Sequence, residues 1–264
     1  MDRPASRWIV DPDDPRAPPH EVWVTLSPDE RADVLASLPS EFPVSEAVPP
    51  EGDHHSDNAQ GSRQTLRRFF ARGGRNVYVG SNLPVYYPAE RMFAPDVFAV
   101  LDVDPHPREH WTVDAEGRGL DVAIEVNVSG RRDKDLRDNV ARYARLGIPE
   151  YFVVDWRRQM LHGWALPPGD KHVYERQLPQ RGRYLSHVLG LELGFSDGRL
   201  RFFVGDAEVP DTDELVKRLS RASNDAVYRA DEEARRADEE KLRADALVLE
   251  VESLRRRLAE LEKS

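Results

Sequence analysis

The sequence predicts an α/β fold built around a strand–helix–strand unit and followed by a separate long helix toward the C-terminus. Three short segments rich in Val, Ile, Phe and Tyr have the length and composition of buried strands: residues 96–103, 120–128 and 150–155. A helical pattern over residues 133–146 separates the second segment from the third, which makes a strand–helix–strand unit. From about Thr212 the composition changes to Ala, Glu, Asp, Arg and Leu without Gly or Pro, which indicates the separate helix.

The helix predicted over residues 133–146 has recognisable ends and two different sides. Apolar residues recur at helical spacing on one side, at Leu136, Val140 and Tyr143. Asp133 can cap the first turn, and Gly147 and Pro149 stop the helix. Cationic residues lie away from the apolar side, and they either contact phosphates or form a solvated face with acidic neighbours: Lys134, Arg137, Arg142 and Arg145.

The first part of the chain predicts an irregular arm and two helices. Residues 1–20 contain many Pro and Asp residues and no periodicity, which is typical of an irregular arm. Ser27 followed three residues later by Glu30 forms a capping box at the start of a short helix. A second helix is predicted over residues 57–71, with its apolar residues toward the core.

A polar segment, residues 51–56, precedes the second helix and contains the adjacent His54 and His55. We expect a solvated loop here rather than a zinc site, because the two His residues lack the spacing with which a helix presents two imidazoles to one metal. Residues 104–111 contain two further His residues together with Pro and charged residues, and they too predict a solvated loop.

Further strand patterns occur on both sides of the central unit. Residues 77–87 alternate aromatic and aliphatic side chains, which favours one or two antiparallel strands facing the core over a base-stacking surface. Two hairpins are predicted later in the chain, one from residues 159–166 and 172–177 and the other from residues 189–195 and 200–204. We expect these strands to complete the central sheet.

The C-terminal helix carries the pattern of a coiled coil. Leucine and valine are spaced four, three, four and three residues apart at Leu247, Val251, Leu254, Leu258 and Leu261. Alanines continue this register backwards, but Glu233 and Glu240 occupy the alternate core positions, so that part should be looser. We favour a parallel homodimer over packing of this seam against the core. The chain should thus consist of an arm at residues 1–20, a main domain at 21–210 and a coiled-coil helix at 211–264.

The composition is that of a soluble protein. The chain has 264 residues, of which 39% are hydrophobic and 33% charged, and no stretch approaches the ~20 apolar residues that span a bilayer. The first residues lack an apolar signal-peptide core, so a cytoplasmic location is expected. The chain has no Cys, which excludes disulfides, thiolate zinc sites and cysteine nucleophiles. A net charge of −10 argues against a protein that coats DNA through bulk electrostatics. The sequence has no Gly-rich phosphate loop, no GxSxG and no HExxH, so it gives no support to a P-loop nucleotide hydrolase, a serine hydrolase or a zinc protease.

Two carboxylates interrupt the apolar strand patterns. Asp96 opens the first predicted strand, and Glu125 lies within the second, in the run Val122-Ala-Ile-Glu-Val126. An unpaired charge in an apolar layer is costly, so Glu125 requires a cation, a hydrogen-bond donor or a raised pKa. Pairing with an Arg, or exposure on a half-buried strand, would satisfy it equally well.

Four short motifs, in this order, carry a resemblance to a known family: Phe93-Ala-Pro-Asp96, Ile124-Glu-Val126, Asp135-Leu136, and the run from Tyr143 to Asp155. Over roughly residues 20 to 205 the sequence resembles the bacterial Uma-type family of restriction-endonuclease-like proteins, which belongs to the PD-(D/E)xK nuclease superfamily. The resemblance implies a restriction-endonuclease-like mixed central sheet flanked by helices, and metal-dependent endonuclease activity on DNA.

The resemblance also implies roles for individual residues. Asp96 and Glu125 match the two acidic positions that converge on a divalent cation, Mg²⁺ with Mn²⁺ as an alternative, because such cations prefer hard oxygen ligands. His54 or His55 matches a His of the family before the second helix, which makes His55 an accessory candidate. Asp135 borders the apolar side of its helix and is a second accessory candidate.

The sequence departs from the family at both lysine positions. Asn127 stands where the superfamily carries Lys after the second acid, and Asn139 stands where Uma-type members carry Lys on the following helix. An amide can orient a water or a phosphate oxygen but adds no charge. Lys134, or Arg131 or Arg132, is close enough in sequence to supply a cation. Two classes of function therefore remain: a metal-dependent DNA endonuclease, and a catalytically weak or inactive nuclease-fold binding module that its coiled-coil tail joins into oligomers.

Overall fold

The structure is a computed structural model that describes residues 8–41, 52–128, 134–169 and 172–261. The chain divides into two compact units, Met1–Asp211 and Thr212–Ser264. The first unit is a mixed α/β domain built on a large sheet, and the second is a single long helix. The predicted fold class, a mixed sheet flanked by helices with a long C-terminal helix, is thereby confirmed.

The central sheet has six strands in the order β1-β3-β5-β6-β7-β8. Their bounds are β1 Val77–Gly80, β3 Val97–Leu101, β5 Val122–Asn127, β6 Glu150–Asp155, β7 Met160–Ala165 and β8 Glu175–Arg176. Only β5 and β6 run parallel within this sheet, and a helical crossover at residues 134–145 joins them. The other neighbours are antiparallel, so the sheet is mixed and the three strands predicted for the central unit are confirmed.

A second sheet stacks on the first instead of extending it. Its order is β12-β11-β10-β9, with β9 Arg183–Ser186, β10 Leu191–Ser196, β11 Arg199–Val204 and β12 Ala207–Glu208. The prediction that residues 189–204 complete the central sheet is wrong, although the hairpin itself is confirmed. The reason is that the apolar sides of β10 and β11 bury Leu193 and Phe202 against the central sheet. A short parallel pair, β2 Val85–Tyr86 and β4 Trp111–Thr112, forms a third, two-stranded sheet.

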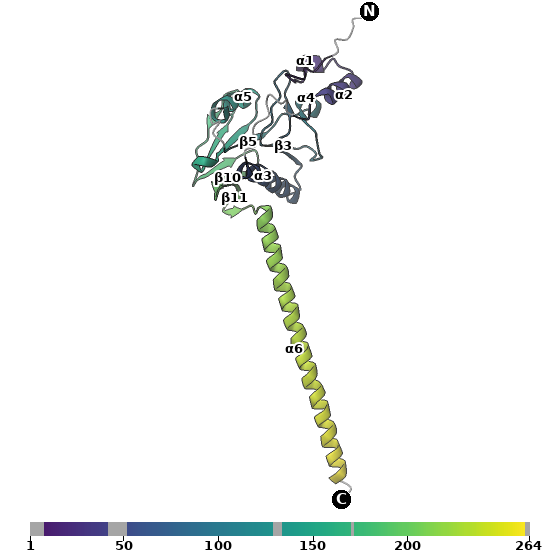
Figure 1. Cartoon of the computed structure of the whole chain (residues 1–264). Helices are drawn as coiled ribbons and strands as arrows, with labels where there is room; N and C mark the ends of the chain where they lie inside the picture. Colours follow the sequence, from purple (N-terminus) through teal and green to yellow (C-terminus); the bar gives the residue numbers. More distant parts are fainter. Residues whose placement is uncertain (1–7, 42–51, 129–133, 170–171, 262–264) are drawn as a thin grey trace, which may run out of the picture. The chain divides into compact units, whose positions relative to one another are not determined.

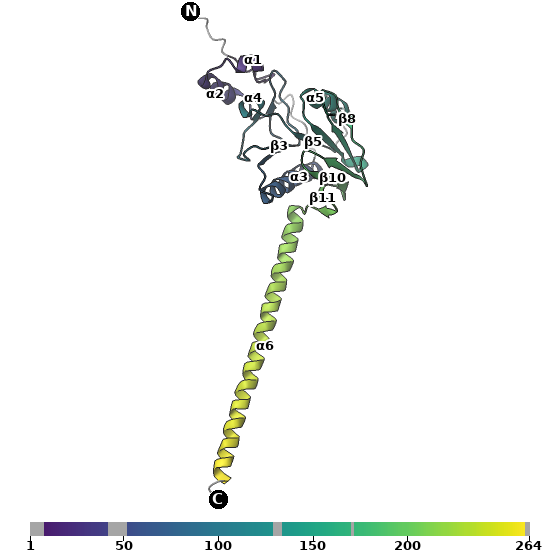
Figure 2. The same cartoon turned by 180° about the vertical axis from the view of Figure 1, so that it is seen from behind.

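Two helical segments cover opposite faces of the central sheet. Helix α3, Asp53–Arg72, packs on one face, and α5, Asn139–Arg145, packs on the other after a π-helical turn, η2 Lys134–Asp138. Figures 1 and 2 show α3 and α5 on opposite sides of β5. The shorter helices are α1 His20–Trp23, α2 Pro28–Ser37, α4 Val113–Glu116 and η3 Trp156–Arg158. The capping box predicted at Ser27 and Glu30 is present.

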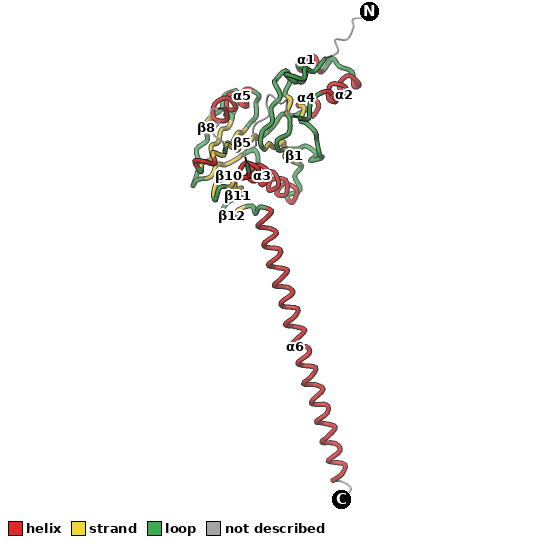
Figure 3. Tube along the Cα trace, in the orientation of Figure 1, coloured by secondary structure: helices red, strands yellow, loops and turns green. Residues whose placement is uncertain are grey.

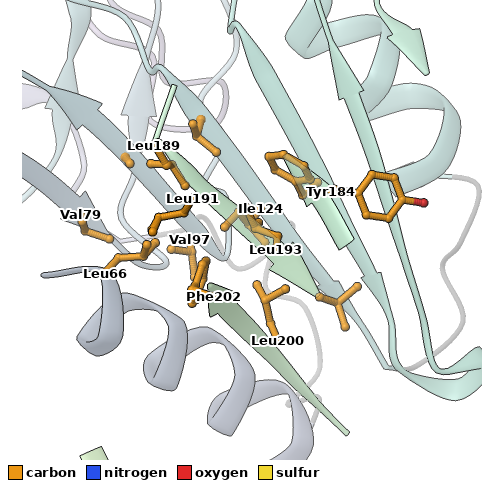
Figure 4. Close-up of a cluster of buried hydrophobic side chains, with 14 of the residues drawn as sticks. Leu66, Val79, Val97, Ile124, Tyr184, Leu189, Leu191, Leu193, Leu200 and Phe202 are labelled. Atoms are coloured by element: carbon orange, nitrogen blue, oxygen red, sulfur yellow. The ribbon is translucent and has the colours of Figure 1, made fainter. Parts of the chain in front are cut away.

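The core follows from the alternation of side chains along β5. Val122, Ile124 and Val126 face α3 and the second sheet, whereas Ala123 faces the aromatic cluster beneath α5. Figure 4 shows the first of these layers, in which Leu66 of α3 and Phe202 of β11 meet Ile124 of β5. The position of Glu125, between Ile124 and Val126, turns it toward the α5 side.

Two segments expected to be solvated are ordered by packing. Helix α3 begins at Asp53, four residues before the predicted start, so His54 and His55 lie on its first turn and not in a loop. Within residues 104–111, Arg108 is buried in an ion pair with Glu116, with Nε 2.6 Å from Oε1, while His106 is exposed. In the segment expected to be an irregular arm, Ala17 is buried in a small apolar cluster. Asp133, the predicted cap, lies outside the described residues.

Helix α6, Thr212–Leu261, is continuous over 50 residues (Figure 3). Its leucine and valine side chains are exposed from Val216 to Leu258. Among the helices described here, none is long and apolar enough to cross a membrane.

Candidate active site

The two carboxylates predicted to form the site stand next to each other at one end of the central sheet. The antiparallel register pairs Val97 of β3 with Ile124 of β5, which sets Asp96, one residue before β3, opposite Glu125. The backbone N–H of Asp96 lies 3.4 Å from Oε2 of Glu125. Directly opposed residues in an antiparallel pair have neighbouring Cβ atoms, so the side chains of Asp96 and Glu125 leave the backbone close to each other.

Asp96 also completes the hydrogen bonding of the sheet. Its Oδ2 accepts a 2.7 Å hydrogen bond from the backbone N–H of Val126. Strand β3 begins only at Val97, so the carboxylate takes the place of a backbone acceptor at the end of the ladder. This bond fixes the side chain of Asp96 against β5.

Glu125 is buried and held by donors from α5. Its Oε1 accepts a 2.7 Å hydrogen bond from the Tyr143 hydroxyl and a 3.4 Å bond from Nδ2 of Asn139. Asn139 and Tyr143 are four residues apart and therefore share one side of the helix. Burial, and then the nearby charge of Glu125, raises the pKa of Tyr143 well above its usual range, so its hydroxyl keeps its proton and donates.

Asn127 and Asn139, which stand where the resemblance implies lysines, both bind a third carboxylate, that of Asp135. Nδ2 of Asn127 lies 2.8 Å from Oδ2 of Asp135, and Nδ2 of Asn139 lies 3.3 Å from Oδ1. The Tyr151 hydroxyl donates a 2.9 Å bond to the backbone carbonyl of Asp135. A chain of amide–carboxylate bonds thus joins Asp135 to Glu125 through Asn139.

His55 approaches the site from the opposite layer. Its Nε2 lies 3.0 Å from Oδ1 of Asp96, and both side chains are largely buried. The neighbouring His54 stacks on Trp156 with the ring centroids 3.9 Å apart. The interpretation of this pair as solvated loop residues is wrong, because both rings gain partners once α3 starts at Asp53.

The cations predicted near the site have different positions. Arg142 and Arg145 both pair with Glu90, at 3.1 and 2.9 Å, which favours the salt-bridged face over direct phosphate contact for these two. The side chain of Lys134 lies outside the described part of the structure, as do Arg131 and Arg132.

Residues 44–202 match the family model described as "Uma2: Putative restriction endonuclease". The match covers more than half of the 264-residue chain. The chain belongs to the Uma2 family. The resemblance found in the sequence motifs is therefore confirmed, and Asp96, Glu125, Asn127 and Asn139 all lie inside the matched region.

A solved structure resembles this Uma2 chain at low sequence identity. It is the crystal structure of a "putative nuclease belonging to DUF820" from Anabaena variabilis ATCC 29413, with 10% identity and a TM-score of 0.44. The similarity covers 60% of this chain and 89% of that chain. No curated protein matches the sequence.

The donor set of this Uma2 site fits a hard divalent cation only in part. Among the described residues, no group of three or more His, Asp or Glu side chains is arranged to hold a metal ion. Asp96 and Glu125 supply carboxylate oxygens, the ligand type that Mg²⁺ prefers, and Mg²⁺ keeps several waters and takes one or two carboxylates plus substrate phosphate. The residues therefore fit a two-carboxylate Mg²⁺ site and not a cage made of protein ligands.

Tyr143 contacts the candidate site although the sequence pattern predicts only a place on the apolar side of its helix. Its ring lies in the aromatic core, and its hydroxyl reaches Glu125. Its spacing of four residues from Asn139 was the available signal, because it puts a hydroxyl beside a residue already assigned to the site.

Proposed function

We propose that the chain is a divalent-cation-dependent endonuclease that hydrolyses phosphodiester bonds in DNA. The observation that carries the proposal is the β3–β5 register, which sets Asp96 opposite Glu125 in a chain of the Uma2 family. Two carboxylates side by side repel each other, and a bound cation would remove that repulsion.

Hydrolysis of a phosphodiester adds one water across a phosphorus–oxygen bond. The water oxygen bonds to phosphorus, the bond from phosphorus to one bridging oxygen breaks, and that oxygen leaves with a proton. When bound, Mg²⁺ would supply a water of lowered pKa and would neutralise charge that develops on the phosphate. Asp96 and Glu125 would hold the cation through their carboxylate oxygens.

The remaining residues would act by orienting these two carboxylates. Tyr143 and Asn139 hold Oε1 of Glu125, and His55 holds Oδ1 of Asp96. Asn127 reaches the same network through Asp135. Lys134, which follows β5 closely in sequence, remains the candidate for a phosphate contact. The absence of Cys suits the reducing cytoplasm.

A second function is favoured by the two amides. Asn127 and Asn139 take the lysine positions of the family and direct their NH₂ groups to carboxylates, so they add no positive charge where charge develops on phosphate. A nuclease fold with this site could bind DNA or another partner with little or no turnover.

The test combines metal binding with cleavage. Wild-type protein is titrated calorimetrically with Mg²⁺ and with Mn²⁺, and thermal melts are recorded with and without the metal. Metal at a hundredfold excess over its dissociation constant should stabilise the fold by roughly 2.7 kcal/mol. Asp96→Asn and Glu125→Gln keep the shape of the side chains and should each abolish the metal response and the nicking of supercoiled plasmid. Glu175→Gln, on the exposed edge strand β8, is the matched control and should change neither.

The outcomes separate the two functions. Metal binding with nicking supports the nuclease, whereas metal or DNA binding without nicking supports the binding module. If wild-type protein binds neither cation at millimolar concentration, with or without DNA, the assignment of Asp96 and Glu125 as metal ligands is wrong. A structural ion pair would instead show no metal response in the wild type and a loss of stability in both variants.

A further inference from the structure

The heptad seam of α6 runs almost the whole length of the helix. The heptad register set by Leu247, Val251, Leu254 and Leu258 extends back to Val216 and Leu219 at the other end. Between the two ends the core positions hold small or acidic residues: Ser223, Ala226, Ala230, Glu233, Ala237, Glu240 and Ala244. The seam therefore has one long apolar block, residues 247–258, a short apolar block at 216–219, and a polar middle.

The long apolar block faces water in the single chain. The exposed fractions of its four residues are 61% for Leu247, 45% for Val251, 55% for Leu254 and 61% for Leu258. A helix with an apolar stripe gains most of its stability by packing that stripe against another surface. The block therefore requires an occupant with a matching stripe.

We propose that this occupant is a second copy of the same chain, aligned parallel and in register. The inference goes beyond the proposed nuclease activity and stands without it. Valine at one core position, as at Val216 and Val251, with leucine at the other, as at Leu219, Leu247 and Leu254, is the combination that favours two strands in a parallel coiled coil. Leu258, at the same core position as Val251, departs from it.

The large and small core residues decide the orientation. In a parallel dimer each layer contains the same residue from both chains, so Leu247, Val251, Leu254 and Leu258 form four consecutive apolar layers. In an antiparallel dimer that overlaps over residues 216–261, Leu247 would instead meet Ala230 and Leu254 would meet Ser223, while Leu258 would keep a large partner, Leu219. The small partners leave part of Leu247 and Leu254 unburied, so the parallel alignment buries more apolar area than this antiparallel one.

Charged residues beside the apolar block support the same alignment. Glu250 precedes the core residue Val251, and Arg255 follows the core residue Leu254. In a parallel coiled coil these flanking positions of the two chains lie beside each other, so Glu250 of one copy meets Arg255 of the other twice per dimer. In the middle, Glu233 and Glu240 would each face the same glutamate. The block at residues 247–258 should therefore associate first and provide most of the stability of the dimer.

Disulfide trapping tests the alignment directly, because the chain contains no Cys and a single introduced Cys is unique. In full-length protein, Val251→Cys should form a covalent dimer on mild oxidation, since the two copies of residue 251 share a core layer. Leu249→Cys is the control, because residue 249 lies on the side of the helix away from the seam. A dimer trapped equally by both variants would mean random collision and would overturn the proposal.

The mass of the protein in solution tests whether it is a dimer. Light scattering of wild-type protein should give twice the chain mass, and Leu254→Glu, which places two charges in one apolar layer, should shift the mass to that of one chain while the far-ultraviolet circular dichroism of the β-sheets persists. A wild-type monomer would mean that the seam packs within its own chain. A dimer that Val251→Cys does not trap would mean an antiparallel pair, and a mass of three or four chains would mean a larger bundle; each contradicts the proposal.

Discussion

The Tyr143 hydroxyl donates a 2.7 Å hydrogen bond to Oε1 of Glu125 in the buried centre of the domain. A buried carboxylate is stable only when hydrogen-bond donors surround it, because the burial of an unpaired charge costs free energy. The aromatic core beneath α5 and the candidate site therefore share this residue.

Tyr143→Phe should weaken both the fold and the site. The variant keeps the ring in the core but removes one donor from Glu125, which should lower the free energy of unfolding by about 1–3 kcal/mol and reduce metal affinity. Urea unfolding and calorimetric titration measure the two effects. Tyr174→Phe is the control, since that hydroxyl donates to the Ile148 carbonyl away from the carboxylates; it should lose stability without changing metal affinity. Equal metal affinity in Tyr143→Phe and wild type would contradict a role for Tyr143 in holding Glu125.

Asn139→Lys should raise metal-dependent cleavage. Asn139 is buried and bonds to both Glu125 and Asp135, so an ammonium there would have acidic partners and would supply the charge that the resemblance implies at this position. Plasmid nicking under single-turnover conditions measures the effect. Asn139→Gln changes the length without adding charge and should not raise the rate. An unchanged rate in Asn139→Lys, against a measurable wild-type rate, would mean that the missing lysine does not limit cleavage.

Glu150 predicts a pH dependence of stability unrelated to the site. Burial raises the pKa of its carboxyl above the ordinary value of 4.5, although the Ser186 hydroxyl and the backbone N–H groups of Val188 and His187 oppose the shift. Because the pKa is raised in the folded state, Glu150 contributes stability at pH values below its ordinary pKa. This contribution is lost as the pH rises through the raised pKa.

Glu150→Gln removes this titration. The stability of the variant relative to wild type should therefore increase as the pH rises from about 4 through the raised pKa. Urea denaturation across this window, with Glu175→Gln as an exposed control, measures the difference. A difference that does not change with pH would show that the hydrogen bonds to Glu150 outweigh its burial.

The polar middle of α6 predicts a stabilising double substitution. Glu233→Leu with Glu240→Leu should extend the apolar block of the seam and raise the concentration-dependent melting temperature of the dimer. Glu232→Leu with Glu239→Leu alters the charge equally, one residue off the core positions, and should have a much smaller effect. The same increase in both pairs would show that net charge, and not the seam, controls association.

The strands and the family could be predicted from the sequence, while the contacts within the site could not. Residues 150–155 have a continuous apolar run with clear ends, and β6 has these bounds. The start of α3 was missed because its N-cap, Gly52, has no capping side chain to recognise. The second sheet stacks on the central sheet because their apolar sides pack together. The alternation of residues along a strand shows that it has an apolar side but not what that side packs against. Tyr143 fits an apolar stripe equally well whether or not its hydroxyl finds a carboxylate.

The bond from the Val126 N–H to Asp96 gives this aspartate a second reason to be present. Any short side chain with an acceptor oxygen closes the end of the ladder, whether or not a cation is ever bound. A relative that has abandoned catalysis would still be under selection to keep Asp or Asn at this position. Among related sequences, loss of the glutamate that corresponds to Glu125 should therefore be the earlier sign of an inactive lineage.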